Sequence, residues 1–201
     1  MKRNTRQDIL TAAKALFNQR GFNAVSTRDI AQAIGISKGN LTYYFKKKEE
    51  IVEAVLLEQT GGPPTGVPST LEELDDFFLD IQKTVEENAF YFWHHAQLSQ
   101  ISEEIRAKQF QVYRGNVEKL TQTFHTLGAD GTLREESFPQ EYDRIIDTLL
   151  LTSIYWMPFC QLKQEDPSQW RFRRQAWSVL FPLLTESGRA ALELILRRKE
   201  A

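Results

Sequence analysis

The segment from Lys38 to Tyr43 carries side chains that can hydrogen-bond the edges of DNA bases. Lys38 can donate to O6 and N7 of a guanine, and Asn40 can pair with the edge of an adenine. Gly39 lets the backbone approach a base closely, while Thr42 and Tyr43 supply hydroxyl groups for a phosphate or a thymine. These residue types in one short segment favour contact with the major groove of duplex DNA.

Two short helices separated by a tight break would hold this segment in place. Ser26 and Asp29 have the spacing of a capping box, which predicts that the first helix starts at Thr27. Gly35 ends that helix, and Ser37 caps a second helix only a few residues later. This pattern is typical of a helix-turn-helix, in which the second helix enters the major groove.

The second predicted helix has two faces of different character. Leu41, Tyr44 and Phe45 are spaced by three and four residues, so we expect all three to pack against the preceding helices. The opposite face then presents the polar residues to DNA.

Neighbouring positions are suited to holding the DNA backbone. Thr27 and Lys48 stand at the starts of predicted helices, where N-terminal amides attract phosphate. Arg28 could reach either a base or a phosphate. The candidate DNA-binding residues are Thr27, Arg28, Ser37, Lys38, Gly39, Asn40, Thr42, Tyr43, Lys46 and Lys48.

Charge is distributed unevenly along the 201 residues. The whole chain has a net charge of −2, whereas residues 1–50 hold ten Lys and Arg against four Asp and Glu, a net charge of +6 that leaves −8 for the rest. A basic N-terminal section on an acidic body indicates that this end meets a polyanion. The alternative is two solvated surfaces whose charges differ by chance.

Composition argues against several other classes of protein. The one cysteine, Cys160, rules out an intrachain disulfide, so we expect a reducing cytoplasm rather than a disulfide-stapled secreted scaffold. The start of the sequence has no apolar stretch typical of a signal peptide, and no later apolar run reaches about 18 residues, so we expect no membrane segment. The sequence has no HExxH and no glycine-rich phosphate loop, which argues against an enzyme.

Hydrophobic periodicity predicts an all-α fold, because no stretch alternates with a period of two for long enough to form a strand. An amphipathic helix at 5–20 precedes the helix pair, and a helix at 48–60 follows it. Two glycines and two prolines then open a linker over 61–69. The remaining predicted helices cover 70–88, 89–99, 102–127, 140–163, 168–186 and 188–199.

The segment from Thr5 to Leu56 resembles the DNA-binding domain of the tetracycline-repressor (TetR/AcrR) family. The matching features are the ILTAAKALF opening, Gly21-Phe22, Thr27 with the DIA at 29–31, Gly35-Ile36-Ser37, the YYF at 43–45 and Lys48-Glu49. The match covers about a quarter of the chain, with the pieces in the family's order and spacing. Thr42 departs from it, since the family usually has a tyrosine there, which removes one expected phosphate contact.

The resemblance implies an architecture and a mode of action. It implies a three-helix DNA-binding domain at 1–47 and a larger helical domain at 48–201 that dimerises and holds a small-molecule pocket, with the helix at 48–60 joining the two. It also implies a homodimeric repressor that needs no cofactor. A small molecule would release this repressor from a pseudo-palindromic operator. The two recognition helices of such a dimer must lie about 34 Å apart, or a multiple of that distance.

Two further sets of residues follow for the larger domain. Residues 140–160 are apolar on nearly every face, so we expect this helix to be buried on both sides, with part of it in an intersubunit four-helix bundle or, alternatively, in an intrachain core. The candidate dimer residues are Ile146, Leu150, Trp177, Leu180, Phe181 and Leu184. Aromatic side chains with a few polar tips suit a ligand cavity, although ordinary core packing is the alternative for each. The candidate ligand residues are Tyr91, Trp93, His94, Tyr113, Thr152, Tyr155, Trp156 and Phe159.

Two alternatives and one exclusion complete the prediction. The first alternative is an all-helical interaction protein, for which the basic section and the polar helix face would be coincidence. The second is a transcriptional activator with the same fold and without ligand-induced release. The adjacent His94 and His95 do not predict a metal site, because neighbours on a helix point about 100° apart and no further ligand stands at a suitable spacing.

Overall fold

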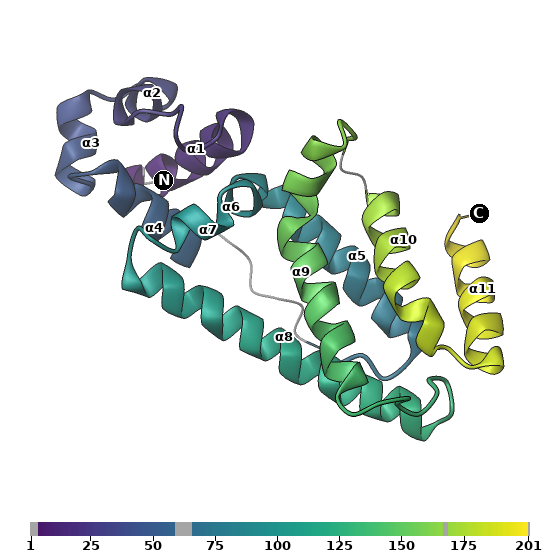
Figure 1. Ribbon diagram of the computed structural model, residues 1–201. Coiled ribbons are helices and arrows are strands. Elements are labelled where there is room, and N and C mark those ends of the chain that lie inside the picture. The colour runs from purple at the N-terminus through teal and green to yellow at the C-terminus, as the bar shows by residue number, and fades with distance from the viewer. Residues whose placement is uncertain (1–3, 59–65, 167–168, 201) are drawn as a thin grey trace. The chain divides into compact units, whose positions relative to one another are not determined.

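The computed structural model describes residues 4–58, 66–166 and 169–200, with the side chains of 169–171 and 200 left out. Within these ranges the chain forms eleven α-helices and one short 3-10 helix, and no strand beyond a single bridge between Leu133 and Leu184 (Figure 1). The predicted all-α fold is confirmed. The predicted linker at 61–69 and the last two residues of the helix at 48–60 lie largely outside the described residues.

The chain divides into two compact units. Unit 1 comprises Met1–Gly61 with Glu86–Phe110, and unit 2 comprises Gly62–Val85 with Gln111–Ala201. Unit 1 therefore contains more than residues 1–47, because a later segment of the chain packs with the N-terminal helices.

Unit 1 holds the helix pair and the helices that support it. Its helices are α1 (Thr5–Arg20), α2 (Thr27–Ala33), α3 (Lys38–Tyr44), α4 (Lys48–Glu58), α6 (Ala89–Trp93) and α7 (His95–Leu98). Phe17, Leu41 and Phe90 are fully buried in one shared core. The predicted helix at 89–99 is two helices, because His94 leaves the helical conformation at φ −122° and its carbonyl accepts the first bonds of the next helix.

Unit 2 is built from longer helices around a second core. Its helices are α5 (Leu71–Glu87), α8 (Glu103–Ala129), α9 (Glu141–Leu162), α10 (Gln169–Leu180), the 3-10 helix η1 (Phe181–Leu183) and α11 (Glu186–Glu200), with the end of α5 and the start of α8 belonging to unit 1. The predicted helix at 168–186 ends earlier, at Leu180. Pro182 has no backbone N–H to donate and disfavours a helical residue before it, so the chain tightens into η1.

Five of the six residues predicted to form a dimer interface lie in the core of unit 2 instead. They are Ile146, Leu150, Trp177, Leu180 and Leu184, each at most 5% exposed. A side chain without exposed surface cannot pack against a partner subunit. We therefore correct the prediction for these five in favour of the intrachain core, and only Phe181 of the six is exposed.

The other face of α9 is open in the single chain, so the chain itself buries this helix on one side only. Leu151, Tyr155, Phe159 and Leu162 follow one another at helical spacing and are between 44% and 79% exposed. By length and composition alone α9 could also cross a membrane, but a helix packed in a core passes the same test. The face of α9 that carries Ile146 packs within unit 2, so we interpret α9 as a packed helix.

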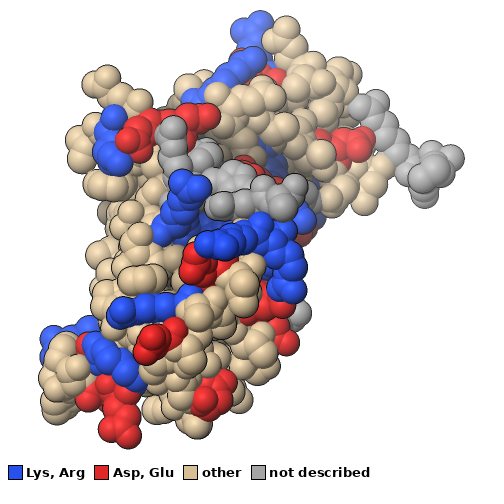
Figure 2. Space-filling model, turned by 90° about the vertical axis from the view of Figure 1, so that its right-hand side faces the viewer, with Lys and Arg blue, Asp and Glu red and all other residues tan. Residues whose placement is uncertain are grey.

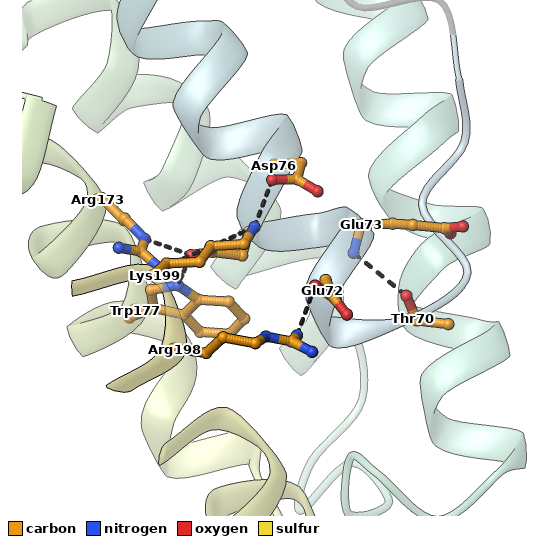
Figure 3. A network of polar contacts seen from close by, with 9 residues as sticks. Thr70, Glu72, Glu73, Asp76, Arg173, Trp177, Arg198 and Lys199 are labelled. Atoms are coloured by element: carbon orange, nitrogen blue, oxygen red, sulfur yellow. Dashed lines mark hydrogen bonds and ion pairs between the residues drawn. The ribbon is translucent and has the colours of Figure 1, made fainter. Parts of the chain in front are cut away.

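A buried ion pair ties α10 and α11 to α5 (Figure 3). Asp75, which is fully buried, accepts two hydrogen bonds from the guanidinium of Arg173 and one of 2.8 Å from Trp177 Nε1. Lys199 from α11 lies 3.1 Å from the same carboxylate and also pairs with Asp76.

Figure 2 looks onto the side of the molecule where α11 lies and shows acidic and basic side chains interspersed there. This surface is therefore electrostatically mixed.

Candidate DNA interface

Local capping determines where the two short helices start. Ser26 Oγ accepts from the Asp29 amide at 3.2 Å, and the Asp29 carboxylate accepts from the Ser26 amide at 2.8 Å, which confirms the predicted capping box. The Ser26 hydroxyl also donates to the Asp29 carboxylate, and this bond, together with the one from the Ser26 amide, lowers the pKa of Asp29. Ser37 Oγ likewise accepts from the Asn40 amide at 3.1 Å and starts α3. Between the helices, Gly35 has φ +69°, a conformation that residues with a Cβ rarely adopt.

The polar face of α3 is open to solvent, as the sequence predicts. Leu41 is fully buried and Phe45 is 5% exposed, so these two side chains anchor α3 on unit 1. Lys38, Asn40 and Tyr43 point outward, and Tyr43 is 84% exposed. The exposed candidate residues on or beside α3 are Ser37, Lys38, Gly39, Asn40, Thr42, Tyr43 and Lys46.

Two side chains of α3 differ from the prediction in detail. Tyr44 is 38% exposed rather than packed in the core, and its ring meets that of Tyr43 edge to face at 5.2 Å. The two rings therefore form one aromatic corner beside the polar face. Thr42 is exposed as predicted, but its hydroxyl donates to the Lys38 carbonyl at 2.8 Å. The oxygen of Thr42 can thus accept a hydrogen bond, whereas its proton is already used.

The candidate phosphate contacts fall into two groups. Arg28 and Lys46 are exposed, so their charged ends are accessible. Lys48 is half-buried, and its ammonium donates to the Phe22 carbonyl at 2.8 Å and lies 5.3 Å from the centre of the Phe22 ring. The structure thus gives the side chain of Lys48 a partner within the chain, which the sequence did not predict.

A segment far away in the sequence supports the helix pair through Asn18 of α1. Asn18 Nδ2 donates to the Glu87 carbonyl at 2.9 Å, and Asn18 Oδ1 accepts from the Phe90 amide at 3.1 Å. The side chain therefore satisfies the end of α5 and the start of α6 together, whereas Asn88, which precedes α6, provides no side-chain cap. Phe17 and Phe90 pack beside it with ring centres 5.5 Å apart. Asn18 and Phe90 are 72 positions apart in the sequence, which explains why no local pattern indicates this contact.

His94, one of the candidate ligand residues, lies against Phe22 in the loop between α1 and α2. Its ring meets the Phe22 ring edge to face at 5.1 Å, on the residue that Lys48 contacts. Burial lowers the pKa of His94, which favours the neutral imidazole. Tyr91 packs against the core of unit 1, and burial raises its pKa to about 12. Trp93 is half-buried nearby in α6.

The other candidate ligand residues belong to unit 2. Tyr113 donates to Asp147 at 3.2 Å and is exposed, as are Tyr155 and Phe159 on the open face of α9. Thr152 lines a small internal cavity, and Trp156 is 5% exposed in the adjoining cluster. Within the described part of the chain, no group of three His, Cys, Asp or Glu side chains is arranged to hold a metal ion.

Two family models match this chain. The model of bacterial regulatory proteins of the tetR family matches residues 9–55, which include α2 and α3. A model of bacterial transcriptional repressors matches residues 55–192 and so covers more than half of the chain.

Curated relatives match over part of the chain. The repressor KstR2 of Mycobacterium tuberculosis is 31% identical over 107 residues, which cover 46% of this chain and 47% of that protein. KstR2 of Mycolicibacterium smegmatis is 45% identical over 51 residues, a quarter of each chain. The regulator UidR of Escherichia coli is 37% identical over 54 residues, 27% of this chain and 28% of UidR. The matched segment thus spans less than half the length of these relatives.

Solved structures extend the likeness over the whole fold. A TetR-family regulator from Marinobacter aquaeolei superposes with a TM-score of 0.82 at 20% identity and covers 97% of this chain and 98% of its own. KstR2 of M. tuberculosis superposes with a TM-score of 0.60 at 21% identity, over 92% and 98%. A Saccharomonospora viridis regulator solved with choline has a TM-score of 0.68 at 16% identity, over 90% and 98%.

Proposed function

The chain belongs to the tetR family of bacterial regulatory proteins, a family of DNA-binding transcriptional regulators rather than enzymes, and from this premise we propose that it is a ligand-released repressor acting as a homodimer. The observation that carries the proposal is the division of α3 into a buried and an open face. Leu41 and Phe45 anchor the helix, which leaves Lys38, Asn40 and Tyr43 free to enter the major groove.

Contacts to the DNA backbone complete the proposed interface. The exposed Arg28 and Lys46 supply positive charge beside α3, and Thr27 stands at the start of α2, where amide groups favour phosphate. The ammonium of Lys48 donates to the Phe22 carbonyl, so we propose that Lys48 stabilises the loop that carries Phe22. We place the lysine contact to phosphate at the exposed Lys46 instead.

The open face of α9 is the surface we propose for the homodimer. Leu151, Tyr155, Phe159 and Leu162 form an exposed apolar stripe on unit 2, and Phe181 is exposed at the end of α10. The same stripe on a second copy would cover it about a twofold axis, the usual symmetry of dimers that read pseudo-palindromic DNA. In this proposal the exposed stripe of α9 forms the dimer interface, in place of the five buried residues that the sequence had indicated.

The release step of the proposal rests on the relatives. KstR2 is described as a ketosteroid transcriptional regulator, and the S. viridis regulator was solved in complex with choline, so one protein of this fold binds a small molecule. We propose a small-molecule effector here as well, bound in unit 2. A cytoplasmic location is consistent with this function.

Fluorescence anisotropy tests the proposal directly. The purified protein is titrated into a labelled duplex from its own upstream region and into a scrambled duplex, at several salt concentrations. Specific binding of two protomers, with affinity falling steeply as salt rises, is expected. Equal binding to both duplexes at every salt concentration contradicts sequence-specific regulation from this site.

Two variants separate base reading from backbone attraction. Lys38→Ala is expected to weaken operator binding by about 1–3 kcal/mol and to relax the preference at one base pair. Lys46→Ala is expected to weaken operator and scrambled duplex alike and to flatten the salt dependence. Lys83→Ala, an exposed lysine on α5, is the matched control and should leave binding unchanged. If Lys38→Ala weakens both duplexes equally, the assignment of Lys38 to base reading is wrong.

A further inference from the structure

A small cavity lies inside unit 2, between α5, α8, α9 and α10. Its volume is about 10 Å³, and its walls are the side chains of Phe78, Ile81, Leu120, Leu149, Leu150, Thr152, Ser153, Phe172 and Ala176. No charged side chain stands among the described residues that line it. Since a volume of this size holds about one water molecule, a larger occupant requires the walls to move apart.

Trp156 brings a buried hydrogen-bond donor next to Phe172, a wall residue of this cavity. It lies one helical turn beyond Thr152 and Ser153, and its ring meets that of Phe172, a wall residue, at 5.6 Å. The indole Nε1 is inaccessible to solvent and finds no acceptor among the residues that the structure describes. A buried donor without an acceptor is destabilising, so a group that accepts from it would gain more than an ordinary hydrogen bond.

The two hydroxyl groups of the wall define the remaining polarity. Thr152 Oγ1 donates to the Thr148 carbonyl at 2.7 Å, and Ser153 Oγ donates to the Leu150 carbonyl at 2.8 Å. Because both hydroxyl protons are used, each oxygen offers lone pairs only. An uncharged occupant is therefore favoured, since no charge is available to compensate an ionised group in this apolar space.

The nearest buried charges do not alter this conclusion. Arg173 follows the wall residue Phe172, but both of its hydrogen bonds to Asp75 neutralise its charge within unit 2. The pair is already complete, with Trp177 and Lys199 as further donors to the carboxylate. An anionic ligand would have to displace Asp75 to reach Arg173.

We propose that the cavity beside Trp156 is the effector site, and that it takes a neutral, mainly apolar molecule with an oxygen acceptor that receives the indole proton. This inference rests on the proposed function for its regulatory meaning, but binding itself can be measured without DNA. Opening requires Phe172 and Trp156 to separate, since the present volume is smaller than any such ligand.

A matched pair of small probes isolates the hydrogen bond. Acetophenone carries a carbonyl, and α-methylstyrene has nearly the same shape with a CH₂ group in place of the oxygen. Their dissociation constants are measured on the full chain by following the indole N–H signals of its four tryptophans in ¹H–¹⁵N spectra. The signal lost in Trp156→Phe identifies Trp156, and Trp177, whose Nε1 is bonded to Asp75, serves as an internal control.

Acetophenone is expected to shift the Trp156 signal and to bind about 3- to 10-fold more tightly than α-methylstyrene, the ratio that one net hydrogen bond gives. In Trp156→Phe the ratio should fall to about one, and Thr152→Leu, which fills the cavity, should abolish binding of both probes. The inference is overturned if neither probe binds, if both bind wild type equally, or if benzoate binds as tightly as acetophenone.

The DNA assay then separates this inference from the proposed function. If acetophenone binds at Trp156 and lowers operator affinity, both stand. If it binds at Trp156 but leaves operator affinity unchanged, the site binds a ligand but is not the effector site, and the inference fails while operator binding stands. If the protein does not bind the duplex at all, the proposed function fails, whatever the measurements with the two probes show.

Discussion

The buried ion pair between Asp75 and Arg173 makes a quantitative test of how unit 2 is held together. Their side chains are 0% and 1% exposed, and Asp75 accepts from Arg173, Trp177 and Lys199 together. Asp75→Asn keeps the size of the side chain but removes the carboxylate charge that pairs with the buried Arg173. Removing one partner of a buried pair typically costs about 3–5 kcal/mol, because the remaining charge stays desolvated.

The predicted loss is measurable by urea denaturation and by calorimetry. For a chain of this length, about 2–4 °C per kcal/mol gives a fall in melting temperature of about 6–20 °C. The double variant Asp75→Leu with Arg173→Met removes both charges, so it should cost clearly less than the sum of the two single changes. Glu193→Gln, which breaks the exposed pair with Arg197 on α11, is the control and should cost under about 0.5 kcal/mol.

Two results would refute this reasoning. If Asp75→Asn costs less than about 1 kcal/mol, the arginine is not desolvated as the structure shows. If the double variant costs the full sum of the single changes, the two residues do not stabilise each other and the bonds in Figure 3 do not carry the energy assigned to them.

Three further predictions follow from particular contacts. Asn18→Ala should destabilise the docking of α6 by about 1–2 kcal/mol, because it leaves one carbonyl and one amide unsatisfied, and the Phe90 amide should exchange its hydrogen faster; unchanged exchange there would contradict this role. Arg134 and the Ser137 amide lower the pKa of Glu141 to about 2, below its value of about 4.3 in the unfolded chain. The ionised Glu141 therefore contributes fully to stability above about pH 4.3, and this contribution is lost as the pH falls toward 2. Glu141→Gln should flatten the dependence of the unfolding free energy on pH in this interval, and an unaltered profile would count against this role. Gly188→Ala would place a Cβ 2.4 Å from a backbone oxygen of residue 132, so thermal denaturation should show a loss of about 1–3 kcal/mol, whereas wild-type stability would mean that this close approach relaxes freely.

Local sequence patterns predicted α2 and α3 because the interactions that start and end these helices are local. The capping box at Ser26 and Asp29, the cap at Ser37 and the turn at Gly35 each depend on residues within a few positions of one another. The same holds for the buried Leu41, whose spacing along α3 determines which side faces the core. Tyr44 was assigned to the wrong surface, because a helical position at the edge of the buried face can point either way.

Tertiary structure alone decided which apolar surface lies inside the subunit. Hydrophobic periodicity shows that α9 is apolar on both sides, but it does not say what covers each side, so Leu150 was taken for an interface residue and Leu151 was not. The pairing of Asp75 with Arg173 and the two bonds of Asn18 join residues about 70–100 positions apart, for which a single sequence carries no signal. The sequence thus determined the helices and the polar face of α3. Long-range packing decided the core, the open stripe on α9 and the burial of the Trp156 indole, because these depend on which helices meet.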